Sequence, residues 1–427
     1  MTSALLIIVF FGLLIINVPI AVCLAISSIV ALISGGYDFS MIATNVYAST
    51  SKFALLAVPY FILAGNIMEK TGISGKLIKF AQSFVGHMRG GLALVCIIVS
   101  CFFAAISGSG PATVAALGLV IIPSMVEHGY RREFASGLMA TSGAIGVIIP
   151  PSITFVIFGC ITGVSIGRLF IAGIIPGIIM GICLAIAALF SIRKDPNIVK
   201  LPKATRKERW IAFKDAFWGL MMPVIILGGI YGGIFTPTES AAVSAVYGLV
   251  VGFFIYKTLK PKDFFKLLAD SLSQTATVMF IMATAGLFSW IMTIEGIASA
   301  AGSILARLSG GNWIVFMLIL NILLLIAGCL LDGSSALYIL TPIFYSVGVS
   351  MGIDPIHMGV VAIVNLAIGM ITPPVGVNLY VACGIGKVTI KEIIKGNMPF
   401  LIASMIALLL ITYCPVLSTF LPNMMNT

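Results

Sequence analysis

The sequence predicts an all-α polytopic membrane protein built from two related halves. Of its 427 residues, 60% are hydrophobic and only 9% are charged, and the mean hydropathy is +1.17, which excludes an ordinary soluble domain. Apolar runs near or above the roughly 20 residues needed to cross a bilayer recur from position 4 to position 421. Because these runs are continuous and do not alternate, they predict helices and not a transmembrane β-barrel.

The first apolar run, 4–33, is expected to be a retained helix. No basic segment precedes it and no small-residue cleavage pattern follows it, so it does not resemble a signal peptide, and the mature protein is expected to start near Met1.

The basic residues predict the topology. Of the 24 Lys and Arg, all but Lys52, Arg168 and Arg307 lie in short links, which the positive-inside rule places in the cytoplasm. These links are 70–89, 131–132, 193–214, 257–266 and 387–395. The N-terminus is then cytoplasmic, the C-terminus periplasmic, and the membrane the bacterial inner membrane. The net charge of +10 reflects this topology, so no nucleic-acid partner is expected.

Three sequence blocks recur at an offset of about 223 residues. The pairs are IGVIIPP at 145–151 with IGMITPP at 368–374, SGSGP at 107–111 with LDGSS at 331–335, and MEKTGI at 68–73 with MTIEGI at 292–297. Agreement of three separate blocks on one register indicates an internal repeat.

We expect a first repeat at 1–192, a basic cytoplasmic link and connecting helix at 193–236, and a second repeat at 237–427. An extra crossing at about 217–235 starts the second half from the opposite side of the membrane, so the repeats are inverted. Inverted-topology repeats are typical of alternating-access transporters, whose substrate and ion sites lie near the membrane midplane at broken helices.

Each half is expected to contain a re-entrant hairpin, at 92–126 and at 312–348. Arms of about 16 residues reach only about 24 Å, less than the roughly 30 Å hydrocarbon core, so the two turns should meet near the midplane. Each half should also contain a broken helix, at 134–158 and at 355–383, because each Pro-Pro pair removes backbone donors.

Two cation sites are expected where a hairpin turn faces a helix break, because freed carbonyls and hydroxyls suit a monovalent cation. The predicted ligands of the first are the hydroxyls of Ser107 and Ser109 and the carbonyls of Gly146, Ile149 and Pro150. The predicted ligands of the second are Gly333 and carbonyls at Gly369, Met370 and Thr372. The structural alternative is that these residues are helix kinks and close-packing glycines.

An anionic substrate would be met by hydroxyls and helix N-termini near the same turns. The expected residues are Ser109, Thr113, Thr154, Asp332, Ser334, Ser335 and Asn378. Asp332 is the one acid inside a hairpin turn; it is expected to bind a cation or a substrate hydroxyl, and its alternative role is a helix cap. Because no chain of Asp, Glu and His crosses the apolar segments, sodium coupling is favoured over a proton relay.

Other polar residues have structural explanations. The order Thr236, Pro237, Glu239 is that of a capping box, so Glu239 is expected to cap a helix. His87, His128 and His357 lie at predicted helix ends. The eight cysteines lie in apolar stretches without metal or redox spacing and are expected to be packing residues.

The motifs LAVPYFILAGN at 56–66, SGSGPATVA at 107–115 and GIFTPTE at 233–239, with the two Pro-Pro elements, resemble the large membrane subunit of tripartite ATP-independent periplasmic (TRAP) transporters, the DctM-like family. The resemblance implies an elevator-type importer driven by two or more sodium ions. It also implies two partners, a small four-helix membrane subunit and a soluble periplasmic substrate-binding protein. Expected substrates are small organic acids such as C4-dicarboxylates and sialic acid, with a general likeness to sialate members. The length suggests that the small subunit is a separate chain.

Three rival functions fit less well. A channel would need a continuous polar pore, whereas polarity is confined to the two repeat-related breaks. A membrane enzyme would need a metal cluster or a Ser/His/Asp constellation, and ATP-driven transport by this chain would need a phosphate-binding loop; none of these patterns occurs in the sequence.

Overall fold

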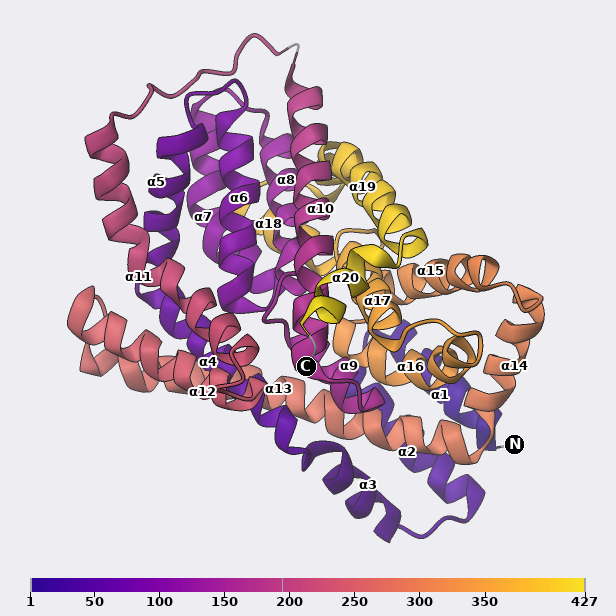
Figure 1. Cartoon of the computed structure of the whole chain (residues 1–427). Helices are drawn as coiled ribbons and strands as arrows, with labels where there is room; N and C mark the ends of the chain where they lie inside the picture. The colour runs from indigo at the N-terminus through magenta and orange to yellow at the C-terminus, as the bar shows by residue number, and fades with distance from the viewer. Residues whose placement is uncertain (1, 194, 426–427) are drawn as a thin grey trace.

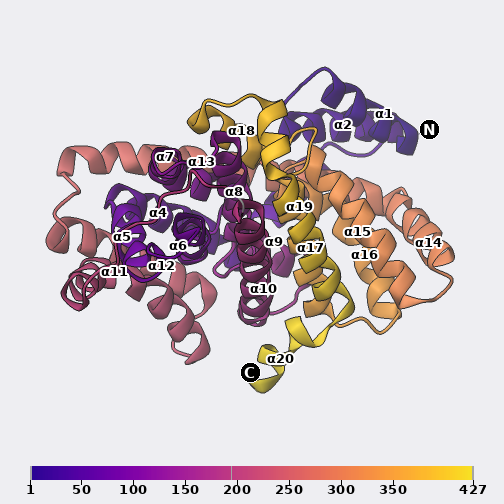
Figure 2. The same ribbon diagram turned by 90° about the horizontal axis from the view of Figure 1, so that it is seen from above.

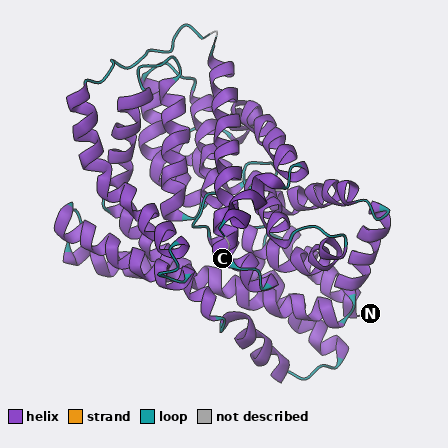
Figure 3. Cartoon of the chain, in the orientation of Figure 1, coloured by secondary structure: helices purple, strands orange, loops and turns teal. Residues whose placement is uncertain are grey.

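The chain is helical throughout the part that the structure describes. The computed structural model describes residues 2–193 and 195–425, and within them it contains twenty α-helices and no strand (Figure 3). Eight helices are long and apolar enough to cross a membrane. These findings confirm an all-α polytopic membrane protein. Lys194, in the predicted basic link, and the predicted outer limits of the repeats at 1 and 427 lie outside the described residues.

The first half of the chain forms ten α-helices and two short 3-10 turns. They are α1 (Thr2–Ile15), α2 (Ile20–Gly35), α3 (Ser40–Thr50), η1 (Phe53–Leu56), α4 (Ala57–Lys70), α5 (Ile73–Val85), α6 (Gly91–Ser107), α7 (Gly110–Glu127), α8 (Arg132–Ala144), η2 (Ile145–Val147), α9 (Ile153–Thr162) and α10 (Ile166–Ile192).

The second half forms another ten α-helices and one π-helical turn. They are α11 (Arg206–Tyr231), α12 (Pro237–Val250), η3 (Val251–Ile255), α13 (Pro261–Ile294), α14 (Ile297–Ser309), α15 (Trp313–Leu330), α16 (Gly333–Ser350), α17 (Pro355–Gly369), α18 (Val377–Gly386), α19 (Ile390–Tyr413) and α20 (Val416–Met424).

The prediction of one helix over 4–33 is wrong, because this run forms two helices that pack together, α1 and α2. Asn17 adopts a left-handed conformation with φ of 64°, and Pro19 caps α2. Asn tolerates such a conformation, and the residue before a proline avoids helical angles, so the helix stops and the chain reverses.

Helix bounds recur along the chain. Both ends of α14 (Ile297–Ser309) lie 224 positions after the ends of α5 (Ile73–Val85). Both ends of α16 (Gly333–Ser350) lie 223 positions after those of α7 (Gly110–Glu127). Both spacings are close to the offset of about 223 residues between the sequence motifs.

A helix–turn–helix occurs at each predicted hairpin. In the first, α6 and α7 are joined at Gly108 and Ser109, where Gly108 has φ of 60°. In the second, α15 and α16 are joined at Leu331 and Asp332, both in extended conformation. Glycine accepts the positive φ of the first turn without strain.

The centre of the molecule is formed by α8 and α17. Every residue of α17 from Ile356 to Gly369 is buried, as is every residue of α8 from Phe134 to Ala144. A helix that is buried all round belongs in a core. The helical path ends in each case before the Pro-Pro pair and resumes at α9 or α18.

Two helices, α4 and α13, connect the halves. Figure 1 shows α13 crossing the lower part of the molecule from the side of α4 to α14, and α13 packs on α2 while α4 packs on α12. Asn66 of α4 donates through Nδ2 to Ser271 Oγ at 2.9 Å on α13. Viewed from above, α1 and α2 lie on the side of α14 to α16, and α11 and α12 on the side of α4 to α6 (Figure 2).

Capping boxes start three of the long helices. Thr236 Oγ1 accepts from the Glu239 backbone N–H at 3.3 Å, and Glu239 Oε2 accepts from the Thr236 N–H at 2.8 Å. This confirms the structural interpretation of Glu239. A second box, at Thr205 and Glu208, starts α11 at Arg206. This helix, α11, ends at Tyr231 and contains the larger part of the segment 217–235.

Candidate functional site

The turn between α6 and α7 gathers oxygen atoms. The hydroxyls of Ser107 and Thr113 lie 2.8 Å apart, and Thr113 Oγ1 also donates to the Ser109 carbonyl at 2.8 Å. Ser107 and Thr113 are both buried, whereas Ser109 is partly accessible. The result is a compact group of two hydroxyls and one carbonyl at the end of α6.

The first helix break packs directly on this turn. A Cβ atom at Gly146 would lie 2.8 Å from Thr113 Oγ1 and 3.1 Å from the Ser109 carbonyl oxygen. A Cβ atom at Gly108 would lie 2.9 Å from the Pro151 carbonyl oxygen. Two glycines thus bring the turn with Ser107 and Ser109 close to the break at Gly146.

The other predicted ligands of the first site, the carbonyls of Ile149 and Pro150, belong to the segment between η2 and α9. The Ile149 side chain points to α10, where it would meet a Cβ atom at Gly177, and the carbonyl that reaches Gly108 is that of Pro151, next to Pro150. Ser152 donates to the Val147 carbonyl at 2.6 Å and lies 2.7 Å from the Thr154 hydroxyl. These hydroxyls add a second polar group at the start of α9.

At the second turn, Asp332 is the N-cap of α16. Its carboxylate accepts from the backbone N–H groups of Ser334 at 2.9 Å and Ser335 at 3.1 Å, and also from the Ser335 hydroxyl. The capping role that the sequence left open is therefore present. Because a carboxylate has about four acceptor positions, these bonds leave capacity for a further ligand.

The second break packs against α15. A Cβ atom at Gly369 would lie 2.5 Å from the Gly328 Cα atom, so Gly369 is a close-packing glycine between α17 and α15. Its carbonyl accepts from the Thr372 N–H at 3.0 Å, and the Met370 carbonyl accepts from the Asn378 N–H at 3.1 Å. The Thr372 hydroxyl donates to the Ile368 carbonyl at 2.8 Å.

The two turns converge on Met370. A Cβ atom at Gly110 would lie 3.2 Å from Met370 Sδ, and one at Gly333 would lie 3.9 Å from Met370 Cε. Gly333 also faces Thr154, whose Cγ2 would be 3.4 Å from the same Cβ position. Residues of α7, from the first half, and of α16, from the second half, therefore meet around Met370.

Asn378 lies at this meeting point. A Cβ atom at Gly110 would be 3.1 Å from Asn378 Nδ2, and this amide donates to the Ala140 carbonyl at 3.1 Å. The Asn378 side chain is fully buried, and its Oδ1 has no hydrogen-bond partner within the described residues. A buried acceptor without a partner is costly, so it suits a ligand that donates or carries positive charge.

A cavity of about 590 Å³ opens beside the first turn. Ser107 and Ser109 line it from the hairpin, and four polar residues that the sequence did not single out line it from α4 and α13. These four are Asn66, Glu69, Gln274 and Thr277. Asn66 stands in the motif at 56–66, but only packing of α4 on α13 reveals that it faces the cavity.

Residues 7–417 match the protein family described as "Tripartite ATP-independent periplasmic transporter, DctM component". The chain belongs to the DctM family. The C4-dicarboxylate TRAP transporter large permease protein DctM of Rhodobacter capsulatus is 41% identical, over 98% of this chain and 99% of that protein. The sialic acid large permease SiaM of Vibrio cholerae is 38% identical, over 97% of this chain and 96% of that protein.

A third relative of this DctM-family chain is the isethionate TRAP transporter permease protein DctMQ of Oleidesulfovibrio alaskensis. It is 41% identical over 95% of this chain and 64% of that longer protein. All three are named permeases, so this DctM-family protein is a transporter component and not an enzyme.

Two solved structures share the fold. The Alcanivorax borkumensis YdaH transporter matches with a TM-score of 0.60 and 16% identity, covering 88% of this chain and 87% of that one. Neisseria gonorrhoeae MtrF, described as one of a class of antimetabolite efflux pumps, matches with a TM-score of 0.57 and 13% identity, covering 86% and 83%.

Proposed function

We propose that this DctM-family protein carries out sodium-coupled secondary active import of a small organic acid, of the sialic acid or C4-dicarboxylate class. The observation that carries the proposal is the oxygen group at the first turn, where Ser107, Thr113 and the Ser109 carbonyl face Gly146. Neutral hydroxyl and carbonyl oxygens at a helix break are the ligands that transporters use for sodium. A second, repeat-related sodium ion would bind near Gly333 and Thr372.

The substrate would bind where the turns converge. Helices α7 and α16 begin at Gly110 and Gly333. The N-terminus of a helix favours anionic groups. Thr154, Asn378 and the cavity beside Ser109 supply donors and space there. Asp332, Ser334 and Ser335 would contact substrate hydroxyls from the second turn. Identity to the C4-dicarboxylate and sialic acid permeases is nearly equal, so it supports both substrate classes.

In this proposal the chain works in the bacterial inner membrane with two partners. A small four-helix TRAP membrane subunit binds alongside it, and a periplasmic substrate-binding protein delivers the organic acid. The joined name DctMQ of the longer relative supports a second membrane component. The family description, which names a tripartite periplasmic transporter, supports three components.

The proposed mechanism is an elevator with two inverted repeats. Its supports are the recurring helix bounds, the broken helices α8–α9 and α17–α18, and the two hairpins. The hairpin arms have 17 or 18 residues, and 18 residues reach about 27 Å, which is short of a roughly 30 Å core.

Crosslinking tests the elevator. Ala112→Cys on α7 and Gln274→Cys on α13 both line the cavity, so a bifunctional thiol reagent should join them and arrest uptake reversibly. Undiminished uptake by the fully crosslinked protein would exclude movement of the hairpin against α13.

Transport itself is tested with proteoliposomes that hold this chain, its small partner and the cognate binding protein. Uptake of radiolabelled sialic acid and succinate is measured with and without an inward sodium gradient. The proposal expects sodium-dependent uptake that requires the binding protein and is abolished in a Ser107→Ala/Ser109→Ala variant. Sodium-independent uptake, or normal kinetics in that variant, would contradict the sodium site.

A further inference from the structure

Basic residues gather at one end of three neighbouring helices. Arg131 is the N-cap of α8, Arg193 follows α10, and Lys395 lies in the second turn of α19. All three side chains are exposed and line a groove of about 570 Å³. Among the described residues that line this groove, none is acidic.

The three cations are weakly paired. The carboxylate of Glu133 lies 3.8 Å from Arg131 Nη1, and this is the one salt bridge within residues 2–193 and 195–425. Arg193 instead stacks on the Phe190 ring, with its Cζ 4.1 Å from the ring centroid. Within the described residues Arg193 and Lys395 have no salt bridge, so the positive charge of the groove is only partly neutralised.

The rest of the groove is apolar and exposed. Phe190 on α10 is 63% exposed, and Met398 and Ile402 on α19 are 47% and 56% exposed. Both α10 and α19 are long and apolar enough to cross a membrane. An elongated ligand lying along them would thus have an apolar body and an anionic end.

The two helices that carry Arg131 and Lys395, α8 and α19, pack closely against each other. A Cβ atom at Gly396 would clash with the Glu133 backbone, and one at Gly137 would lie 2.7 Å from the Asn397 nitrogen. Because α8 and α19 touch through backbone atoms here, the positions of Arg131 and Lys395 are set relative to each other.

We propose that this groove binds a phospholipid with an anionic headgroup. Its phosphate is held by the three cations at the helix ends, and its acyl chains lie along the exposed apolar side chains of α10 and α19. Basic pockets between membrane helices recognise anionic headgroups in this way. The site is separate from the cavity at the hairpin turns and does not depend on the proposed transport activity.

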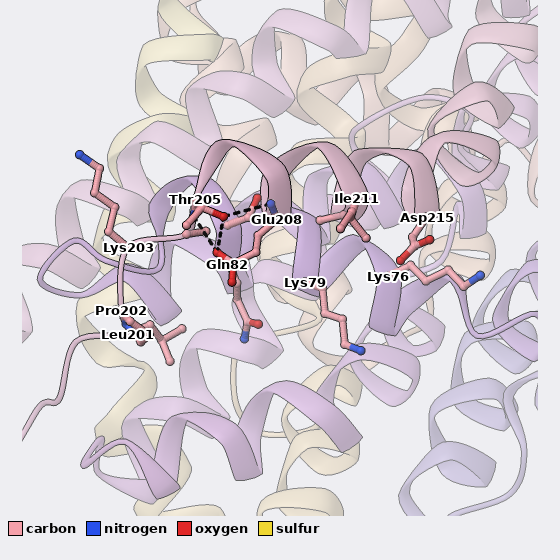
Figure 4. A pocket seen from close by; sticks show the side chains of 13 residues that line it. Lys76, Lys79, Gln82, Leu201, Pro202, Lys203, Thr205, Glu208, Ile211 and Asp215 are labelled. Atoms are coloured by element: carbon pink, nitrogen blue, oxygen red, sulfur yellow. Dashed lines mark hydrogen bonds between the residues drawn. The ribbon is translucent and has the colours of Figure 1, made fainter.

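A second groove supplies the matched control. It has a volume of about 640 Å³ between α5 and α11 and is also lysine-rich (Figure 4). However, Glu208 and Asp215 line it as well, and the Lys76 ammonium lies over the Tyr256 ring at 3.2 Å from its centroid. Mixed charge makes this groove the weaker candidate for an anion.

The test is native mass spectrometry of the purified full chain titrated with phosphatidylglycerol, cardiolipin or phosphatidylcholine. An Arg131→Gln/Arg193→Gln/Lys395→Gln variant should bind the two anionic lipids at least tenfold more weakly. Phosphatidylcholine binding should not change. A Lys79→Gln/Lys203→Gln/Lys207→Gln variant, which loses the same charge at exposed positions near the second groove, should bind like the unchanged protein.

Three results would overturn the proposal. Equal losses in both triple variants would indicate diffuse surface charge. Displacement of the lipid by millimolar glycerol phosphate would indicate a site for small soluble anions. Displacement by the purified small membrane subunit, with subunit binding lost in the first variant, would indicate a protein interface. If the triple variant does not elute as a monodisperse protein, the single Lys395→Glu variant is used, with the same tenfold criterion.

Discussion

Gly146 shows how the absence of a side chain shapes the oxygen group at the first turn. The Thr113 hydroxyl and the Ser109 carbonyl occupy the space into which a Cβ atom would project. The sequence could predict that the turn and the break are polar, because hydroxyl residues and a Pro-Pro pair punctuate apolar runs. It could not predict that the Pro151 carbonyl faces Gly108, since this depends on how the chain leaves the break.

We predict that Gly146→Ala weakens sodium activation of uptake roughly tenfold, the effect of about 1.4 kcal/mol. The added methyl group would push apart the oxygens of Thr113 and Ser109, from which it would be 2.8 and 3.1 Å away. The measurement is the sodium concentration for half-maximal uptake in proteoliposomes. Gly228→Ala, where nothing lies within 4 Å of the new Cβ atom, is the control and should be unchanged.

Two substitutions separate the helix-capping role of Asp332 from its proposed role as a ligand. Asparagine caps helices about as well as aspartate, so Asp332→Asn should retain the stability of α16, whereas Asp332→Ala should lose about 1 kcal/mol. We predict that both variants insert into the membrane and that both lose uptake, because each removes the charge. Normal uptake by Asp332→Asn would reduce this residue to a structural cap.

At the scale of elements, helices bounded by glycine, proline and hydroxyl residues could be predicted, and amphipathic ones could not. Helices α6 and α15 end, and α9 and α18 begin, close to glycine, proline or hydroxyl residues that interrupt the apolar runs. The run at 4–33 was wrongly predicted as one helix. Apolar residues lie on both sides of Asn17, so the pattern does not show that the chain direction reverses there. The short helices α5 and α14 could not be predicted because they lack a long apolar run. That α4 and α13 face the cavity could not be predicted either, because it arises from tertiary packing.

The crossing of α15 and α17 gives a prediction about packing. Gly369→Ala would place a Cβ atom 2.5 Å from the Gly328 Cα atom, and overpacking of this kind costs about 1–3 kcal/mol. The unfolding temperature in detergent should therefore fall by several degrees. Gly384→Ala on α18, with nothing within 4 Å, should leave it unchanged. An unchanged value for Gly369→Ala would show that the two helices can move apart without cost.

For the whole molecule, the distribution of basic residues predicts which ends face the cytoplasm. Lys203 and Arg307 are both exposed and lie on opposite sides in this prediction. With the exposed Cys414 replaced by alanine, Lys203→Cys should react with a membrane-impermeant thiol reagent only in inside-out vesicles. Arg307→Cys should react only in intact spheroplasts. Equal labelling of both from the outside would contradict the topology.

The packing of α2 on α13 has a consequence for synthesis. The ribosome must add the chain from Gly35 to Pro261, the end of α2 and the start of α13, before this contact can begin to form. At about 5–20 residues per second, that interval lasts on the order of ten seconds or more. During it, α1 and α2 are in the membrane without their final neighbour. A nascent chain halted before Pro261 should therefore leave this pair open to insertion factors and membrane proteases.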